Sequence, residues 1–286
     1  MKIQLIHTHK TDSPPSGSGL AFRQGNLYAV GDDAPYLYVL DMDYATQRRI
    51  SLSDTAGFDK RIAKSEKMDF EALEFVSDDE LVVFGSGSKS PQRDVFAKVK
   101  INPEYATEVF PITDFYNHLR ELPEFQNTEL NIEAAAYHKG EMYLLNRRKN
   151  LIISFVYQDF IAYLKNGGTL PELEITPCRL PEIQGFEYGF SGATFLPNSG
   201  EILFTASAEA TDNAYDDGEI LGSILGIMDK NGSVKKYVNI PQNDSEPLKI
   251  ESVTVLNTDN GEYELLLVSD DDQGNSVFVK GIVTGI

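Results

Sequence analysis

Short apolar stretches separated by polar turns recur along this chain, and a five-residue pattern opens each group of them. The pattern begins with Glu or Ser, continues with two small or apolar residues and one variable position, and ends on an apolar or aromatic residue. It occurs at residues 18–22, 71–75, 133–137, 191–195 and 251–255. A second apolar run starts 9 to 14 residues after the first residue of each copy. A fixed period of this kind is the signature of a repeat protein.

The repeat predicts an all-β fold in which each copy forms one four-stranded unit. Successive copies begin 53, 62, 58 and 60 residues apart. The last copy has room for only three strands, and the alternating segment 2–9 supplies the missing one. We therefore expect a β-propeller that spans residues 1–286 as a single domain, with the N-terminal strand completing the last blade. Five blades fit best, and six remain open if segment 51–69 or 106–130 contains a degenerate blade. A β-sandwich would not explain the fivefold repeat.

The composition of the chain limits where the protein is expected to be found and which partners it is expected to bind. The 41% of hydrophobic residues suffice for a packed core, and no apolar run approaches the length of a membrane span. The apolar centre of the N-terminal segment is too short for a signal peptide, so a cytoplasmic protein is expected unless a leader was removed. The lone Cys178 agrees with a reducing compartment. The net charge of −19 disfavours nucleic acids and anionic membranes, both of which bind clustered Lys and Arg.

Propeller topology indicates where to look for a site. The innermost strand of each blade starts, and the second strand ends, on the same face of the ring, around the mouth of the central channel. Three of the five copies begin with an acidic residue, namely Glu71, Glu133 and Glu251. Three carboxylates aimed at one axis would repel one another, so they require a cation, an arginine or a proton. The other residues that we expect to line this mouth as ligand contacts are Ser18, Asp32, Ser86, Lys89, Arg147, Ser191 and Ser207.

Two segments resemble a known family. Asp69-Phe70-Glu71-Ala72-Leu73 and Asn131-Ile132-Glu133-Ala134-Ala135 are similar to the acidic-Glu-Gly-Leu pattern of the esterase-like phytase family. They are also similar to calcium-dependent lactonase-type propellers and to bacterial propellers linked to quorum-sensing regulators. The resemblance implies a divalent cation, calcium above all, at the channel mouth, where it would polarise a phosphoryl or carbonyl oxygen.

By the same resemblance, the metal ligands would be Glu71, Glu133, Glu251 and Asp270, a set of oxygen donors that suits calcium. The chain departs from the family pattern in two ways. Ala72, Ala134 and Ser252 replace the glycine, and Arg147 stands where a metal site would carry Asn or Asp.

Each candidate also has a structural interpretation. The glutamates at the blade starts would then bond the backbone of the neighbouring blade and only close the ring. Arg147 either neutralises them as an ion pair or grips a phosphate or carboxylate of a substrate. His118, in a helical segment before the third copy, is the one histidine that we consider as a general base, so Arg147 and His118 are the candidate catalytic residues.

Two functions of different class follow. The first is a divalent-cation-dependent hydrolase of a phosphoester or lactone, with Arg147 or Lys89 binding the anionic part of a small substrate. The second is a non-catalytic propeller that binds a small ligand or peptide at the channel mouth, with structural glutamates. The sequence lacks the nucleophile elbow, the phosphate-binding loop, the dinucleotide fingerprint and zinc-ligand spacing. Whether the protein is an enzyme is therefore left open by the sequence.

Overall fold

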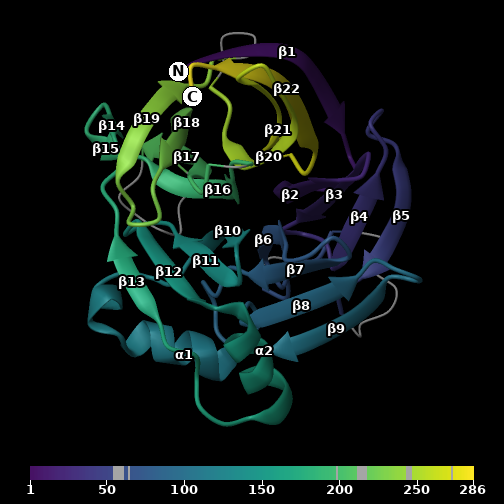
Figure 1. The fold of residues 1–286 in the computed structure, drawn as a ribbon, viewed down its shortest axis with the longest axis vertical. Coiled ribbons are helices and arrows are strands. Elements are labelled where there is room, and N and C mark those ends of the chain that lie inside the picture. The colour runs from purple at the N-terminus through teal and green to yellow at the C-terminus, as the bar shows by residue number, and fades with distance from the viewer. Residues whose placement is uncertain (54–60, 64, 198, 211–217, 243–246, 272) are drawn as a thin grey trace.

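The computed structural model describes residues 1–53, 61–63, 65–197, 199–210, 218–242, 247–271 and 273–286. Its strands form five four-stranded antiparallel sheets arranged as a ring (Figure 1). From the inside outward, the first blade comprises β2 (Gly17–Arg23), β3 (Asn26–Gly31), β4 (Tyr36–Leu40) and β5 (Thr46–Ser51). The second comprises β6 (Phe70–Phe75), β7 (Glu80–Gly85), β8 (Val95–Lys100) and β9 (Ala106–Pro111). The third comprises β10 (Ile132–His138), β11 (Glu141–Asn146), β12 (Leu151–Val156) and β13 (Glu174–Pro177).

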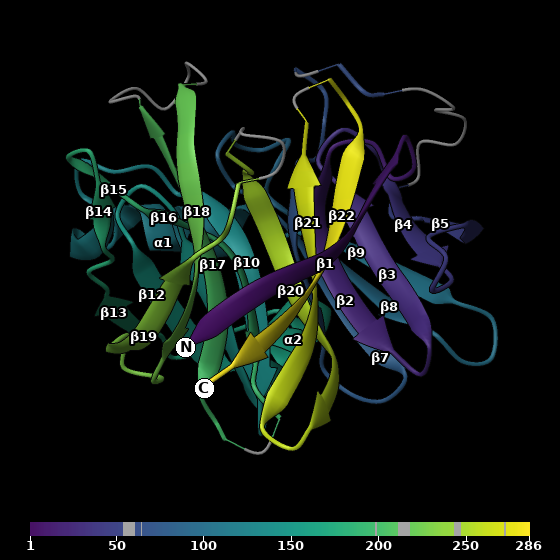
Figure 2. The ribbon, with the colours of Figure 1, turned by 90° about the horizontal axis from the view of Figure 1, so that it is seen from above.

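The two remaining blades complete the ring. The fourth comprises β16 (Gly189–Phe195), β17 (Ile202–Ala210), β18 (Glu219–Met228) and β19 (Val234–Asn239). The fifth comprises β20 (Ile250–Asp259), β21 (Glu262–Asp270), β22 (Ser276–Thr284) and, as its outer strand, β1 (Lys2–Thr11). β1 pairs antiparallel with β22, so both chain ends lie side by side on one blade (Figures 1 and 2). The predicted five-bladed propeller and its closure by the N-terminal strand are confirmed.

The burial of side chains decreases from the second strand of each blade to its outer strand, and this explains why apolar runs alternate with polar segments in the sequence. Each inner strand carries a small residue directly after the first residue of the repeat, near the point where the five strands converge on the axis, as in the Glu-Ala-Ala-Ala run of β10. The second strands are apolar runs that are buried on both faces, and in β7 every residue after Glu80 is buried. The outer strands β5, β9 and β19 are mostly exposed.

The hydrophobic core is divided among the blade interfaces. Five clusters of buried residues occur in the described chain, and each joins two neighbouring blades. The cluster that closes the ring packs Leu27 and Leu40 of the first blade against Leu266, Val268 and Phe278 of the fifth. Since every blade is held from both sides, the residues at the inner strand starts are fixed relative to one another across the channel.

The connections between blades hold the other elements. Segment 106–130 contains β9, α1 (Thr113–Glu121) and the short helix η1 (Pro123–Phe125), so it forms no sixth blade. The helix α2 (Tyr157–Asn166) follows β12, and the hairpin β14 (Glu182–Ile183) and β15 (Phe186–Glu187) precedes the fourth blade. α1 and α2 lie at the outer edge of the ring (Figure 1). Phe115 of α1 packs against Phe160 of α2 in a tilted arrangement, with ring centres 4.9 Å apart. Neither helix, nor any other in the described chain, has the length and apolarity to cross a bilayer.

Candidate functional site

A β-bulge recurs at the start of all five inner strands. In each blade the pairing between the inner and second strands skips one residue. The skipped residue is the first residue of the five-residue repeat, and we call these five the ring positions. They are Ser18, Glu71, Glu133, Ser191 and Glu251. A bulge turns the extra side chain out of the regular pleat. The repeat in the sequence therefore marks the point where each blade directs one polar group to the channel mouth.

The serine candidates are engaged in contacts within and between blades. Ser18 donates its hydroxyl hydrogen to the carbonyl oxygen of Phe70 in the second blade. Ser207, at the end of the second strand of the fourth blade, donates to the carbonyl oxygen of Ile250 in the fifth at 2.9 Å. Ser191 donates to the Thr205 hydroxyl at 3.2 Å. Their hydrogen bonds are those of residues that hold neighbouring strands together, and their role as ligand contacts stays a prediction.

Other predicted residues are spread more widely. Ser86, which follows β7, donates to the carboxylate of Asp69, which precedes β6 in the same blade. Lys89 lies exposed on the loop after β7. His118 lies on α1 at the outer edge of the ring, and the described contacts join it to no residue of the mouth. Asp270 ends β21 and acts electrostatically on Arg61.

The ring glutamates Glu133 and Glu251 each have a cationic partner in what we call the paired half of the mouth. Its five members are Glu133, Arg147, Glu209, Lys249 and Glu251. Arg147 lies 3.8 Å from Glu133 and 2.9 Å from Glu209, between guanidinium nitrogen and carboxylate oxygen. Lys249 lies 3.2 Å from Glu251 and 3.3 Å from Glu209. Two cations thus sit among three carboxylates.

The ionisation of the paired half follows from these contacts. Burial raises the pKa of Glu133 to about 7 against the opposing effect of Arg147. Burial also acts to raise the pKa of Glu209, but Arg147 and Lys249 outweigh it, so this pKa falls below its ordinary range. Glu251 raises the pKa of Lys249 well above its usual value, which keeps that ammonium group charged.

A glycine makes room for Arg147. Gly189 lies two residues before the ring position of the fourth blade, where the second and fifth blades carry Asp69 and Lys249. A side chain at Gly189 would place its Cβ 2.7 Å from Cγ of Arg147, closer than such contacts occur. At this position the fourth blade therefore leaves room for Arg147, whereas the second and fifth blades carry charged side chains.

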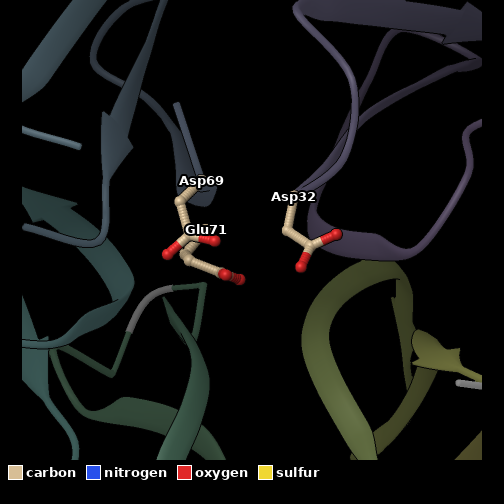
Figure 3. Close-up of side chains that lie close together, drawn as sticks. All are labelled: Asp32, Asp69 and Glu71. Carbon is tan, nitrogen blue, oxygen red and sulfur yellow. The ribbon is translucent and has the colours of Figure 1, made fainter. Parts of the chain in front are cut away.

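A different arrangement surrounds Glu71. One carboxylate oxygen each of Asp32, Asp69 and Glu71 lies within 4.8 Å of the others, and we call this group the acidic triad (Figure 3). Asp32 follows β3 in the first blade, Asp69 precedes β6, and Glu71 is the ring position of the second blade. Asp69 adopts a left-handed backbone conformation with φ of 55°, which is uncommon for a residue other than glycine. Backbone outliers of this kind are frequent at functional sites.

Lys67 neutralises part of the acidic triad. Its ammonium group contacts Asp32, lies 2.9 Å from Asp69 and 3.7 Å from Asp33, and is almost fully buried. Burial alone would lower the pKa of Lys67, but Asp69, Asp32 and Glu71 outweigh it and raise this pKa. Lys67 is thus a permanent counter-ion, and Arg93 adds a second one on the far side of Asp69.

The Glu71 carboxylate is the exception within this network. No hydrogen bond or ion pair to it is found in the described part of the chain. Burial, followed by Asp69 and Glu133, raises its pKa well above the ordinary range. Oδ1 of Asp32 is likewise buried and, among the described residues, accepts no hydrogen bond. Burial raises the pKa of Asp32 to about 7, although Lys67 opposes the shift. Two residues of the triad, Glu71 and Asp32, therefore have oxygen atoms with unused capacity as ligands.

The triad is the one group in the described chain where three such donors converge, so a cation site differs from the expected set. Glu71 belongs to it, whereas Glu133, Glu251 and Asp270 do not. Hard carboxylate oxygens suit Ca²⁺ or Mg²⁺. Sequence reasoning missed Lys67, Asp69, Glu209 and Lys249 as members of the site. Asp69 and Lys249 had a detectable signal, because each precedes a ring glutamate by two residues.

A pocket of about 220 Å³ opens beside the paired half. Arg147, Arg148, Asn150, Tyr188, Ser207 and Glu209 contribute to its lining. Asn150 is buried there and donates from its side-chain amide to the carbonyl oxygen of Tyr188 at 2.8 Å. The pocket is polar and carries arginine side chains, which is the lining expected for a small anionic group.

Comparisons with known proteins define the relatives of the chain. The model of a family described as "Family of unknown function (DUF6929)" matches residues 13–283. Among curated proteins no sequence match was found. The fold is similar to that of Myxococcus xanthus glutaminyl cyclase, with 10% identity, a TM-score of 0.58, and coverage of 98% of this chain and 97% of that one. It is also similar to a candidate glycoside hydrolase from Parabacteroides distasonis, with 9% identity, a TM-score of 0.50, and coverage of 96% and 87%. At these identities the likeness concerns the propeller fold.

Proposed function

Because the chain belongs to the family of unknown function DUF6929, only its own site can indicate an activity, and we propose a cation-dependent hydrolase acting at the channel mouth. The substrate would be a small phosphoester or lactone that carries an anionic group. The two structural neighbours do not decide the chemistry, since propellers support many unrelated functions.

The observation that carries this proposal is the state of Glu71. A carboxylate surrounded by Asp32, Asp69 and Glu133, with no ion pair of its own in the described chain, carries a large cost when ionised. A proton or a metal cation would relieve that cost. A metal cation fits this site because Oδ1 of Asp32, which accepts no hydrogen bond from the described residues, offers a further donor in the same space.

We assign cation binding to the acidic triad and substrate binding to the paired half. Asp32, Asp69 and Glu71 would hold a divalent cation such as calcium, which when bound acts as a Lewis acid on a phosphoryl or carbonyl oxygen. Arg147 and Lys249 would orient the anionic group of the substrate next to the 220 Å³ pocket. Glu133, with its pKa raised to about 7, is suited to accept or release a proton near neutral pH.

The test is whether a divalent cation stabilises the protein through Glu71. Chelator-treated protein should show a rise in melting temperature with CaCl₂, and a cation at 100 times its Kd stabilises by about 2.7 kcal/mol. Glu71→Gln should abolish the rise. Glu201→Gln, which removes a carboxylate paired with Lys235 away from the mouth, is the matched control and should keep it. Hydrolysis of a panel of phosphoesters and lactones should then depend on the same cation.

A wild-type melting temperature that ignores Ca²⁺, Mg²⁺ and Mn²⁺ would contradict the proposal, as would an unchanged response in Glu71→Gln. Those results would favour the second candidate, a non-catalytic propeller that binds a small ligand or peptide. One observation supports that candidate directly. Lys67, Arg147 and Lys249 already neutralise most of the carboxylates, so the network is able to act as a structural seal of the ring.

A further inference from the structure

The other end of the channel holds a second pocket, of about 340 Å³, to which all five blades contribute. Four aromatic side chains from four blades surround it, and each occupies the last position of the five-residue repeat. They are Phe22, Phe75, Tyr137 and Phe195. The fifth blade contributes Val255 at the same position. The last position of the repeat thus places an aromatic residue at the pocket in four of the five blades, and we call these four side chains the aromatic rim.

Of the two carboxylates that line this pocket, Asp78 is exposed and paired with Arg23, whereas Glu74 is held by hydrogen bonds. Glu74 accepts a hydrogen bond from the backbone N–H of Phe75 at 2.7 Å. It also accepts one from the hydroxyl of Thr194 in the fourth blade at 3.0 Å, across the channel. These two bonds hold the carboxylate in place, with one oxygen tied to its own strand and the other to the far side.

The described chain supplies Glu74 with no ion-pair partner. The cation that acts on it is Arg23, whose guanidinium carbon lies 4.7 Å from the centre of the Phe75 ring. That group is paired with Asp78 at 2.8 Å. Burial raises the pKa of Glu74 to about 7, and the bonds from Phe75 and Thr194 oppose this shift. Arg23 and Asp78 also line the pocket, but they pair with each other, so the charged form of Glu74 has no ion pair of its own among the described residues.

We propose that this pocket binds a small organic cation, a protonated primary amine with an apolar body, whose ammonium group pairs with Glu74. Aromatic faces attract cations through their quadrupole, and the same rings bury the apolar part of such a ligand. A buried carboxylate gains most from a partner that brings both charge and hydrogen-bond donors. The volume lies at the lower end of the range typical of small-molecule sites.

This site is independent of the cation site proposed at the other mouth. Glu71 and Glu74 lie on the same strand, β6, three residues and about 10 Å apart. Glu71 is a bulged residue in the charged mouth, whereas Glu74 pairs regularly opposite Val82 and serves the aromatic pocket. Substitution of one therefore tests one pocket at a time.

The experiment is calorimetric titration of the full chain with benzylammonium chloride, with neutral benzyl alcohol as the matched probe. We expect benzylammonium to bind and benzyl alcohol to bind at least about tenfold more weakly, since a charge-assisted hydrogen bond is lost. Glu74→Gln should weaken benzylammonium binding by at least about tenfold. Phe195→Leu should weaken it about two- to fivefold through the lost aromatic face. Glu71→Gln should leave it unchanged.

Several outcomes would overturn the inference. These are no binding of benzylammonium, equal binding of benzyl alcohol, an unaltered affinity in Glu74→Gln, or loss of binding in Glu71→Gln instead. The glutamine oxygen can still accept from the N–H of Phe75, and its NH2 group can donate to the hydroxyl oxygen of Thr194, so the variant should fold, as a melting curve will show. If it does not fold, the comparison of the charged and neutral probes on the wild-type chain decides the matter.

Discussion

The paired half of the charged mouth and the aromatic mouth lie at opposite ends of one channel, yet their carboxylates are stabilised in opposite ways. At the charged mouth, Glu133 and Glu251 are buried beside Arg147 and Lys249. At the aromatic mouth, Glu74 has hydrogen bonds but no close cation in the described chain. Removing one partner of a buried ion pair destabilises the protein strongly, because the other charge stays buried without a partner. A buried carboxylate without a partner instead destabilises the protein while it is charged. Removing a charged group should therefore lower the stability of the protein in the paired half and raise it at Glu74.

The largest effect is expected for Arg147→Met at the charged mouth. The variant leaves Glu133 and Glu209 without their guanidinium partner in a buried site, which should destabilise the protein by about 3–5 kcal/mol. Urea unfolding measures the change. Arg148→Met, at the exposed neighbouring residue, is the control and should cost less than about 1 kcal/mol. Equal effects of the two variants would mean that the paired half is not an electrostatic unit.

A smaller effect is expected for Lys67→Met, and it should depend on cations. Asp32 loses its ammonium partner, while Asp69 keeps Arg93, so we expect a loss of about 3 kcal/mol in chelator. Calcium should restore more stability to this variant than to the wild type, because the acidic triad then lacks its internal counter-ion. Melting temperatures with and without CaCl₂ measure this difference. A variant that calcium does not rescue would argue for purely structural carboxylates.

The smallest effect, with the opposite sign, is expected for Glu74→Gln at the aromatic mouth. Burial raises the pKa of Glu74 from 4.5 to about 7. The folded state thus holds this proton more tightly than the unfolded chain. The resulting stability is fully present below pH 4.5 and is lost as the pH rises through 7.

The glutamine variant should lack this loss and be more stable than the wild type at pH 8. We expect about 1–2 kcal/mol, since the side chain is partly open to the pocket. Urea unfolding at pH 5 and pH 8 provides the measurement. A wild type that is the more stable protein at pH 8 would show that Arg23 neutralises Glu74 after all.

Some features of the charged mouth were predictable from the sequence, and others were not. Glu71, Glu133 and Glu251 recur at one position of the repeat, so their common placement followed from periodicity alone. Asp69 and Lys249 lie two residues before ring glutamates, but the equivalent residue in the fourth blade is Gly189, which breaks the pattern. Lys67 comes from a connecting loop outside the repeat, and no spacing rule predicts that its ammonium group reaches Asp32.

The sequence by itself determined the repeat and the positions that face the channel, and it favoured five blades over six, because strand alternation and turns are local properties of the chain. The tertiary structure decided which carboxylates are neutralised and which are not. Arg147 meets Glu209 from another blade, and Thr194 meets Glu74 across the channel. Such pairings depend on the closure of the ring and on side-chain reach, and both arise only when residues far apart in the chain are brought together.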